Sequence, residues 1–314
     1  MKREIVVVGS INLDLVASSS RIPLAGETVA GSTFRTFPGG KGANQAVAAA
    51  RLGRAVTILG KLGNDVFSVE LRDSLEQAGV ETGPVENVAD SSGVALINTD
   101  AKGENAITVV PGANSHLSPV DIDANSELLH RAGIVLTQLE VPIETVEHLA
   151  SFTRREGIPL MLDPAPARPL SPVLLSCVDW LTPNETETCV LLGRAERNLS
   201  QSELEDAANA LLQRGCKNVI LKLGRRGCYL ALADGTRRAV PAHQVSTVDT
   251  TAAGDAFNGA FAVGLLSGRD PVNSAEWACA VATLSVTRHG AQPSMPTANE
   301  LEDFLEAQSI GSKP

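Results

Sequence analysis

Strand-like and helix-like segments alternate along nearly the whole chain. Apolar runs of strand length are found at 5–9, 56–60, 134–139, 160–163, 180–182 and 219–223. Segments of helical character are found at 43–52, 66–77, 143–156, 185–192, 201–214, 256–266, 274–287 and 299–306. Strands that alternate with helices predict βαβ units and a doubly wound parallel sheet. Aromatic residues make up only 3% of the sequence, so Val, Ile, Leu and Ala must fill the core, as in a parallel sheet covered by helices.

Two regions break this alternation. The segment 15–38 lacks a helical period, and 94–110 reads as two short strands around a turn at 100–103. We expect a small antiparallel sheet, built from about 12–38 and 94–110, that stands off the main body as a lid over a ligand. The alternatives are ordinary insertions on a sheet edge and a surface that pairs with a second subunit. No linker divides the sequence, so one domain over 1–314 is expected.

Charge and composition exclude several classes of partner. The formal net charge of the 314 residues is −10, and dispersed Lys and Arg form no basic stripe for nucleic acid. No segment approaches the roughly 20 apolar residues that cross a bilayer. The apolar run after Lys2 and Arg3 is too short for a signal peptide and is better interpreted as a first strand. Five cysteines without C-x-x-C spacing indicate reduced core residues of a cytoplasmic protein rather than disulfides or a zinc site.

The stretch 249–255, Asp-Thr-Thr-Ala-Ala-Gly-Asp, directly precedes an apolar helical segment. A loop of small residues lets backbone N–H groups approach a ligand, and a helix N-terminus favours an anion. Because a carboxylate there would repel phosphate, Asp255 is interpreted as a general base that deprotonates a hydroxyl while the amides stabilise a transferred phosphoryl group. The alternative is an acid that merely stabilises the first turn of a helix.

A glycine-rich loop, Gly39-Gly40-Lys41-Gly42-Ala43-Asn44, precedes the first Ala-rich helix. Adjacent glycines permit close backbone approach and positive φ, and Lys41 and Asn44 offer donors to a hydroxylated ligand. The G-x-x-x-x-G-K-[ST] spacing of a P-loop is absent from the chain. The alternative is a glycine-rich turn that opens a helix.

Polar residues also follow the predicted strands, where ligands of such sheets bind. After the first strand, Asn12 and Asp14 alternate with apolar residues and so share one face of an extended segment. One carboxylate can accept two sugar hydroxyls, which makes Asp14 a candidate sugar anchor, although a solvated strand face would look the same. The loops after later strands contribute Gln138, Glu140, Asp163 and Asn184. No G-x-G-x-x-G follows the first strand, which disfavours dinucleotide binding.

Two more motifs suit a polyphosphate. Thr-Pro-Asn-Glu-Thr-Glu at 182–187 would end a strand and place acids near a magnesium ion that keeps its waters, or would simply cap a helix. Lys-Leu-Gly-Arg-Arg-Gly at 222–227 would approach phosphates through backbone and Arg. The alternative is a hairpin turn between strands at 219–223 and 228–232, and the motif would form that turn whether or not it binds phosphate.

Taken together, G-G-K-G-A-N-Q-A, P-N-E-T-E and D-T-x-A-A-G-D-x-F-N-G resemble the ribokinase branch of the PfkB carbohydrate kinase family. The resemblance covers essentially the whole chain and keeps the motifs in family order. It implies a ribokinase-like fold and ATP-dependent transfer of the γ-phosphoryl group to a sugar hydroxyl, O5 of D-ribose in this branch. It also implies a homodimer that associates through the lid.

The resemblance assigns roles by position in this sequence. Asp255 is the base, and the amides of Ala252, Ala253, Gly254 and Asp255 form the anion hole. The sugar is held by Asn12, Asp14, Gly39, Gly40, Lys41, Asn44 and Glu140. ATP and its Mg²⁺ lie along Asn184, Glu187, Lys222, Leu223, Gly224, Arg225, Arg226, Gly227 and Cys279. A monovalent cation, usually K⁺, is held at Asp249, Thr251, Ser285, Arg288, Gly290 and Ser294, partly through backbone oxygens.

Three positions depart from the family pattern. Lys222 stands where a small hydroxyl residue is frequent, Cys279 where His is frequent near adenine, and Asp163 where Asn is common. The departures at Lys222 and Cys279 predict altered nucleotide affinity rather than lost activity. The remaining alternatives are another pentose or nucleoside kinase of the family, such as a deoxyribokinase, and a sugar-binding regulator without catalysis. An intact Asp255 and anion-hole loop argue against the regulator.

Overall fold

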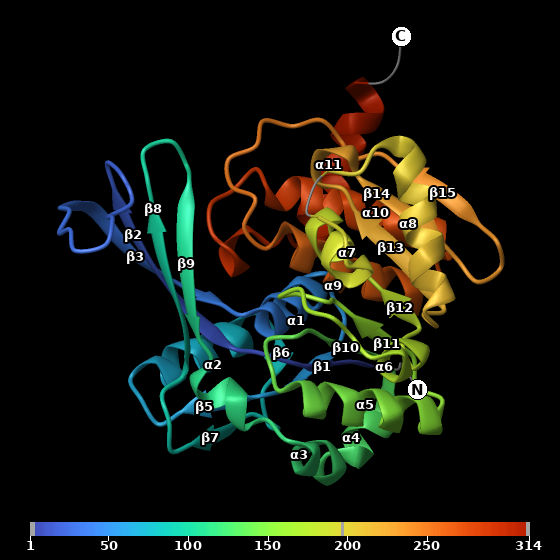
Figure 1. The fold of residues 1–314 in the computed structure, drawn as a ribbon, viewed down its shortest axis with the longest axis horizontal. Coiled ribbons are helices and arrows are strands. Elements are labelled where there is room, and N and C mark those ends of the chain that lie inside the picture. Colours follow the sequence, from blue (N-terminus) through green and yellow to red (C-terminus); the bar gives the residue numbers. More distant parts are fainter. Residues whose placement is uncertain (1–3, 196–197, 312–314) are drawn as a thin grey trace.

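The computed structural model describes residues 4–195 and 198–311, and its main body is built on a nine-stranded sheet (Figure 1). The strand order is β15-β14-β13-β12-β11-β10-β1-β4-β6. The parallel strands are β1 (Glu4–Val8), β4 (Val56–Leu59), β6 (Val80–Glu81), β10 (Ala132–Thr137), β11 (Leu160–Leu162), β12 (Trp180–Leu181) and β13 (Asn218–Lys222). The antiparallel edge consists of β14 (Cys228–Ala231) and β15 (Arg237–Val240). The predicted fold class and the predicted hairpin at β13–β14 are confirmed.

Helices cover both faces of this sheet, so every central strand is buried on two sides. In β1, Ile5 and Val7 pack into one core cluster and Val6 and Val8 into the other, and all four are fully buried. The first cluster includes residues of α1 (Lys41–Arg51), α2 (Phe67–Gln77), α9 (Ala253–Leu266), α10 (Pro271–Ser285) and α11 (Ala298–Gly311). The second includes residues of α3 (Pro119–Ala124), α4 (Ser126–Arg131), α5 (Ile143–Glu156), α6 (Pro172–Ser176), α7 (Glu185–Leu192) and α8 (Gln201–Gln213).

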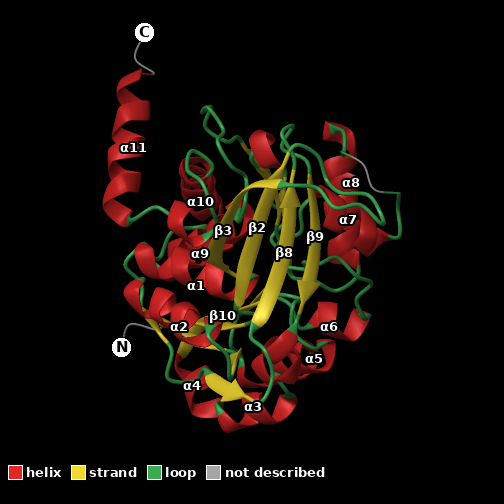
Figure 2. Cartoon of the chain, turned by 90° about the vertical axis from the view of Figure 1, so that its left-hand side faces the viewer, coloured by secondary structure: helices red, strands yellow, loops and turns green. Residues whose placement is uncertain are grey.

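The predicted lid is a second sheet that projects from this body, with its face toward the viewer in Figure 2. Its order is β3-β2-β8-β9, formed by β2 (Asn12–Ser19), β3 (Gly31–Gly39), β8 (Gly93–Thr99) and β9 (Asn105–Val110). The two hairpins are antiparallel, as expected, whereas the central pair β2–β8 is parallel because both strands leave the body in the same direction. The turn at 100–103 is present, with Gly103 at φ 83° and Asp100 accepting hydrogen bonds from the Lys102 and Glu104 amides.

Several short elements carry no periodicity that a sequence pattern could reveal. They are β5 (Lys61–Gly63), β7 (Glu86–Val88), the 3₁₀ turns η1 (Gly112–His116), η2 (Gly224–Arg226) and η3 (Gln292–Ser294), and the helices α3, α4 and α6. Helix α9 begins at Ala253, three residues before its predicted start, because small residues open it without an apolar pattern. Asp255 therefore lies inside the first helical turn. Lys2 and Arg3 lie outside the described residues.

The order in which the strands are connected determines where a ligand site can lie. After β1 the chain builds β4 and β6 on one side and then returns to β10 on the other, so a topological switch point lies between β1 and β10. Ligands of open α/β sheets bind at the carboxyl ends of strands beside such a point. Asp14, in the lid strand β2 that follows β1, and the loops that carry Glu140, Asp163 and Asn184 all come after strands that end at this edge.

One close helix contact should be sensitive to a single methyl group. A Cβ at Gly259 in α9 would lie 2.7 Å from the Gln45 carbonyl oxygen and 2.8 Å from the Ala48 Cβ in α1. We expect Gly259→Ala to lower the free energy of unfolding by about 2 kcal/mol, since overpacking forces the helices apart. Urea denaturation measures this change. Gly83→Ala is the control, because its Cβ would meet only a side-chain oxygen at 3.4 Å. Equal stability of both variants would contradict the tight α1–α9 contact.

Candidate active site

The N-terminus of α9 presents a carboxylate and a strained loop together. Ala252, the residue before α9, has φ 58° and is the single non-glycine residue with positive φ in 4–195 and 198–311. Such strain persists where the surroundings hold it and is concentrated at functional sites. In the first turn, the Gly254 and Asp255 amides have no intrahelical acceptor, so they can donate to an anion. The predicted anion-hole loop has a geometry that suits this role.

The Asp255 carboxylate is held from α1. Its side chain is 4% exposed and accepts hydrogen bonds from Asn44 Nδ2 at 3.0 Å and Gln45 Nε2 at 3.1 Å. Burial raises the pKa of Asp255, the nearby charge of Lys41 opposes that rise, and Asp163 adds to it. A raised pKa brings a carboxylate closer to the working pH of a general base.

The predicted sugar residues meet around Glu140. Its Oε2 accepts hydrogen bonds from Ser10 Oγ at 2.5 Å, the Lys41 amide at 3.1 Å and Asn12 Nδ2 at 3.5 Å. Glycine is required at positions 39 and 40 because neighbouring atoms approach the backbone there too closely for a Cβ. A Cβ at Gly39 would lie 2.6 Å from the Asp14 carboxylate, and one at Gly40, whose φ is 87°, would lie 2.7 Å from the Asn12 amide nitrogen.

Acidic groups crowd this part of the site. Burial, Glu140 and Asp255 raise the pKa of Asp14 to about 7, and Lys41 opposes the rise. Burial alone would lower the pKa of the Lys41 ammonium, but Asp255, Asp163 and Glu140 outweigh it and raise that pKa. Lys41 is therefore charged at neutral pH and lies among carboxylates.

The buried side chain of Asn114 connects the predicted sugar-binding residue Asn12 to the end of the lid that adjoins the main body. Asn114 follows β9, and its side chain accepts from the Ile11 amide at 2.9 Å and donates to the Ile11 carbonyl at 3.2 Å. It also donates to Asn12 Oδ1 at 2.7 Å. The end of the last lid strand is thus bound to the start of the first.

A cavity of about 590 Å³ extends from Asp255 along the carboxyl ends of the strands. Its lining includes the predicted residues Lys41, Asn184, Glu187, Lys222, Gly224, Arg225, Gly227, Ala252, Ala253, Gly254, Asp255 and Cys279. Leu223 and Arg226 do not line it: Leu223 is buried in the core, and Arg226 donates to Glu185 at 2.6 Å and to the Leu199 carbonyl at 2.9 Å. The cavity is large enough for a nucleotide-sized ligand.

Asn184 and Glu187 form a reciprocal cap at the start of α7. The backbone N–H of Asn184 donates to Glu187 Oε2 at 2.7 Å, and the backbone N–H of Glu187 donates to Asn184 Oδ1 at 2.8 Å. Burial raises the pKa of Glu187, while the charge of Lys222 opposes this. Both interpretations of this motif coexist, because the capping residues also line the cavity.

The predicted cation residues are only partly brought together. Asp249 accepts from the Thr251 amide at 2.9 Å, from Thr251 Oγ1 at 2.6 Å and from the Gly290 amide at 2.9 Å. Burial would raise the pKa of Asp249, but these hydrogen bonds outweigh it and lower that pKa. Ser285 and Ser294 donate to carbonyls of their own turns, and Arg288 pairs with Glu300 at 2.7 Å. Asp249, Thr251 and Gly290 therefore form one clip, beside the anion-hole loop.

Sequence reasoning did not assign a role to Gln45. It lies directly after Asn44, and Gln45 Nε2 contacts both Asp255 and Asp163, each at 3.1 Å. Gln138 Nε2 donates to Gln45 Oε1 at 2.8 Å and fixes the orientation of the amide. The signal was its helical spacing, since Gln45 lies four residues after Lys41 and so shares a face of α1 with it.

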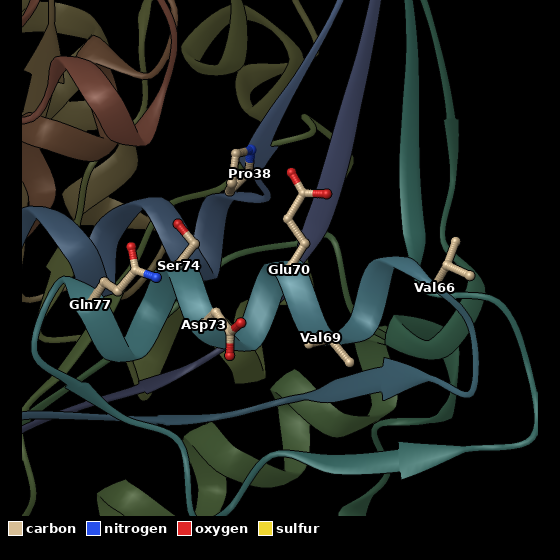
Figure 3. Close-up of a pocket in the computed structure, with 7 residues that line it drawn as sticks. All are labelled: Pro38, Val66, Val69, Glu70, Asp73, Ser74 and Gln77. Atoms are coloured by element: carbon tan, nitrogen blue, oxygen red, sulfur yellow. The ribbon is translucent and has the colours of Figure 1, made fainter.

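A second hollow, of about 550 Å³, lies over α2 (Figure 3). It is lined by Pro38, Val66, Val69, Glu70, Asp73, Ser74 and Gln77. None of these is a predicted site residue, and the cluster offers acids and exposed valines without a cation. Many of the predicted site residues line the cavity at Asp255 instead.

Comparison with known proteins identifies the family of this chain. Residues 2–298 match the family described as pfkB family carbohydrate kinase. Ribokinase of Bacillus subtilis (strain 168) is 41% identical over 304 residues, which cover 96% of this chain and 99% of that protein. Deoxyribokinase of Salmonella typhi is 38% identical, with 96% of this chain and 98% of that protein covered. The chain therefore belongs to the pfkB family of carbohydrate kinases.

Solved structures show the same fold. The structure of Arabidopsis thaliana ribokinase complexed with ribose and ATP superposes with a TM-score of 0.91 at 33% identity. The alignment covers 98% of this chain and 99% of that one. Among the helices of 4–195 and 198–311, none has the length and apolar character needed to span a membrane.

Proposed function

We propose that this protein transfers the γ-phosphoryl group of ATP to O5 of D-ribose. The observation that carries the proposal is the buried Asp255 carboxylate, hydrogen-bonded to Asn44 and Gln45 at the mouth of the positive-φ loop. The similarity to ribokinases over almost the whole chain, and to one solved with ribose and ATP, supports the choice of substrates.

In this mechanism the protein positions groups and stabilises charge. Asp14, Asn12 and Glu140 hold sugar hydroxyls, and Asp255 takes the proton of the attacking hydroxyl. In the predicted anion hole of residues 252–255, the Gly254 and Asp255 amides then donate to the phosphoryl oxygens, whereas the Ala253 amide donates to the Thr250 carbonyl at 3.3 Å. Phosphoryl transfer depends mostly on such positioning and electrostatic stabilisation.

Asn184 and Glu187 line the cavity at a position that suits the water shell of a magnesium ion. Within the described residues no three His, Cys, Asp or Glu side chains are grouped so that they could ligate a metal directly, which fits an ion that keeps its waters and takes few protein ligands. Asn184 and Glu187 would hold its waters. When bound, Mg²⁺ neutralises charge on the polyphosphate and orients it.

We further propose a K⁺ site at the clip of Asp249, Thr251 and Gly290. A fixed cation beside the anion-hole loop would orient its amides before phosphate arrives. Replacing K⁺ with tetramethylammonium at constant ionic strength should slow turnover about tenfold, which corresponds to a barrier increase of about 1.4 kcal/mol. Steady-state rates in the two salts measure this. Equal rates would contradict the cation site.

The substrate proposal is tested by coupled ADP release with MgATP and K⁺. D-ribose, 2-deoxy-D-ribose, fructose and adenosine are compared by kcat/KM. A strong preference for D-ribose supports the proposal. Preference for 2-deoxy-D-ribose would favour the second candidate, a deoxyribokinase, which two relatives at 38% identity make a specific alternative.

We also propose that two copies associate through the lid. Exposed apolar side chains gather there, with Phe34 66% and Ile107 53% exposed. All six residues of β9 are exposed, so apolar surface would be left in water in a monomer. Light scattering of wild type and Phe34→Ser tests this association.

A further inference from the structure

Lys222 carries its charge to the anion hole. It ends β13, and its Nζ donates to Asp163 Oδ1 at 2.9 Å in a pair whose side chains are 12% and 2% exposed. A Cβ placed on Gly254 would lie 3.2 Å from the same Nζ. The ammonium therefore lies directly beside the loop whose amides face the cavity.

The pair is also bound to the base. The second oxygen of Asp163 accepts from Gln45 Nε2 at 3.1 Å, and that nitrogen also donates to Asp255 at 3.1 Å. One amide group thus spans the two carboxylates. The result is a continuous chain of hydrogen bonds from Lys222 through Asp163 and Gln45 to Asp255.

The Lys222 ammonium has donors to spare. An ammonium has three N–H donors, and within the described part of the chain it makes one hydrogen bond, to Asp163. The other two are at a largely buried position that lines the cavity. Buried charged groups with unused donors are costly, so a ligand with several acceptor oxygens is the expected partner.

On this basis, and resting on the proposed kinase function, we propose that Lys222 is a catalytic residue that contacts the terminal phosphate of the nucleotide. Asp163 is its positioning residue. In the transfer step, the sugar hydroxyl oxygen forms a bond to the γ-phosphorus while the bond from that phosphorus to the bridging oxygen breaks. The bonding pair leaves with ADP, and the hydroxyl proton moves to Asp255. Lys222 and the loop amides offset the charge on the phosphoryl group in flight.

The competing explanation is that Lys222 only neutralises Asp163. A buried ion pair is weak evidence for a stabilising role, because a neutral pair of similar size is often as stable. Removing both charges together separates the two explanations. If the pair is merely structural, the doubly neutral enzyme should work. If Lys222 contacts phosphate, the doubly neutral enzyme should be as stable as wild type but should turn over slowly.

The test compares Lys222→Met, Lys222→Arg and the double variant Asp163→Asn/Lys222→Met with wild type. We expect kcat to fall about 100-fold in Lys222→Met and to stay low in the double variant, even where its melting temperature equals that of wild type. Calorimetry should show that affinity for β,γ-imido-ATP falls about tenfold more than affinity for AMP. Lys222→Arg should keep the preference for the triphosphate.

Two results would overturn the proposal: recovery of kcat in the double variant, or equal losses of affinity for AMP and β,γ-imido-ATP in Lys222→Met. If Lys222→Met does not fold, the double variant and Lys222→Arg decide the same question. Lys217→Met is the matched control, since Lys217 pairs with Asp179 at 3.3 Å on the surface, where it is 62% exposed. Failure of wild type to phosphorylate any sugar would count against the proposed function, whereas the nucleotide ratio tests Lys222 separately.

Discussion

Asp255→Asn should lower kcat by about 10³-fold while D-ribose still binds. The substitution removes the proton acceptor from a site where it contacts Asn44 and Gln45, and a positioned general base contributes about 10²–10⁴-fold to a rate. The change preserves side-chain volume, so the cavity and the anion-hole loop should keep their shape. ADP release measures turnover, and titration calorimetry measures ribose binding.

The folded state supplies an internal check on Asp255→Asn. Burial raises the pKa of Asp255, so the ionised carboxylate destabilises the fold at neutral pH and the variant should be no less stable than wild type. Asp303→Asn, an exposed position on α11, is the matched control and should change neither rate nor stability. Turnover near the wild-type value in Asp255→Asn would contradict its assignment as the base.

Asp14→Asn should weaken sugar binding and strengthen the fold at the same time. Loss of hydrogen bonds to a charged acceptor costs about 1.5–3 kcal/mol, so KM for D-ribose should rise about 100-fold. The pKa of Asp14 is about 7, above its ordinary value of 3.8, because of burial, Glu140 and Asp255. Ionisation therefore opposes folding, by an amount that grows between pH 3.8 and pH 7 and is complete above pH 7.

The sign of the Asp14 effect can be read from two pH values. At pH 8 the variant should be more stable than wild type by up to about 4 kcal/mol, and at pH 4 the difference should nearly vanish. In wild type, KM for D-ribose should fall as pH rises from 6 to 8, because the ionised carboxylate accepts sugar hydroxyls. A less stable variant at pH 8 would contradict the crowding of acids around Asp14.

The sequence was sufficient for the central strands, the longer flanking helices and the lid because each leaves a local pattern, whereas short elements such as β6, β15, α3, α4 and α6 leave none. Apolar runs mark β1 and β10, and the period-free segments mark the lid. The cluster around Glu140 could also be anticipated, since strands of one sheet end at one edge. Helical spacing could place Gln45 on the same face of α1 as Lys41, but its contact with Asp255 could not be anticipated, because that contact depends on the packing of α1 against α9, which the missing side chain of Gly259 permits.

The role of the Lys222–Asp163 pair was likewise hidden in the sequence. The two residues stand 59 positions apart, and the sequence singled out each of them separately but gave no sign that they pair. Their pairing arises because β11 and β13 flank β12 in the sheet, so that the two side chains leave the same edge. To predict an ion pair between positions so far apart, one must know the order and register of the strands in the sheet. The composition of the sequence gives neither.

One buried side chain joins the beginning and the end of the lid. Asn114, in the turn after β9, hydrogen-bonds to Ile11 directly before β2 and to Asn12 at the start of β2. Because Asn12 is one of the residues that we propose to hold the sugar, a displacement of the chain after β9 should also displace a sugar ligand. Any change that moves the lid at this end should therefore alter sugar affinity, even when the altered residue lies outside the sugar site.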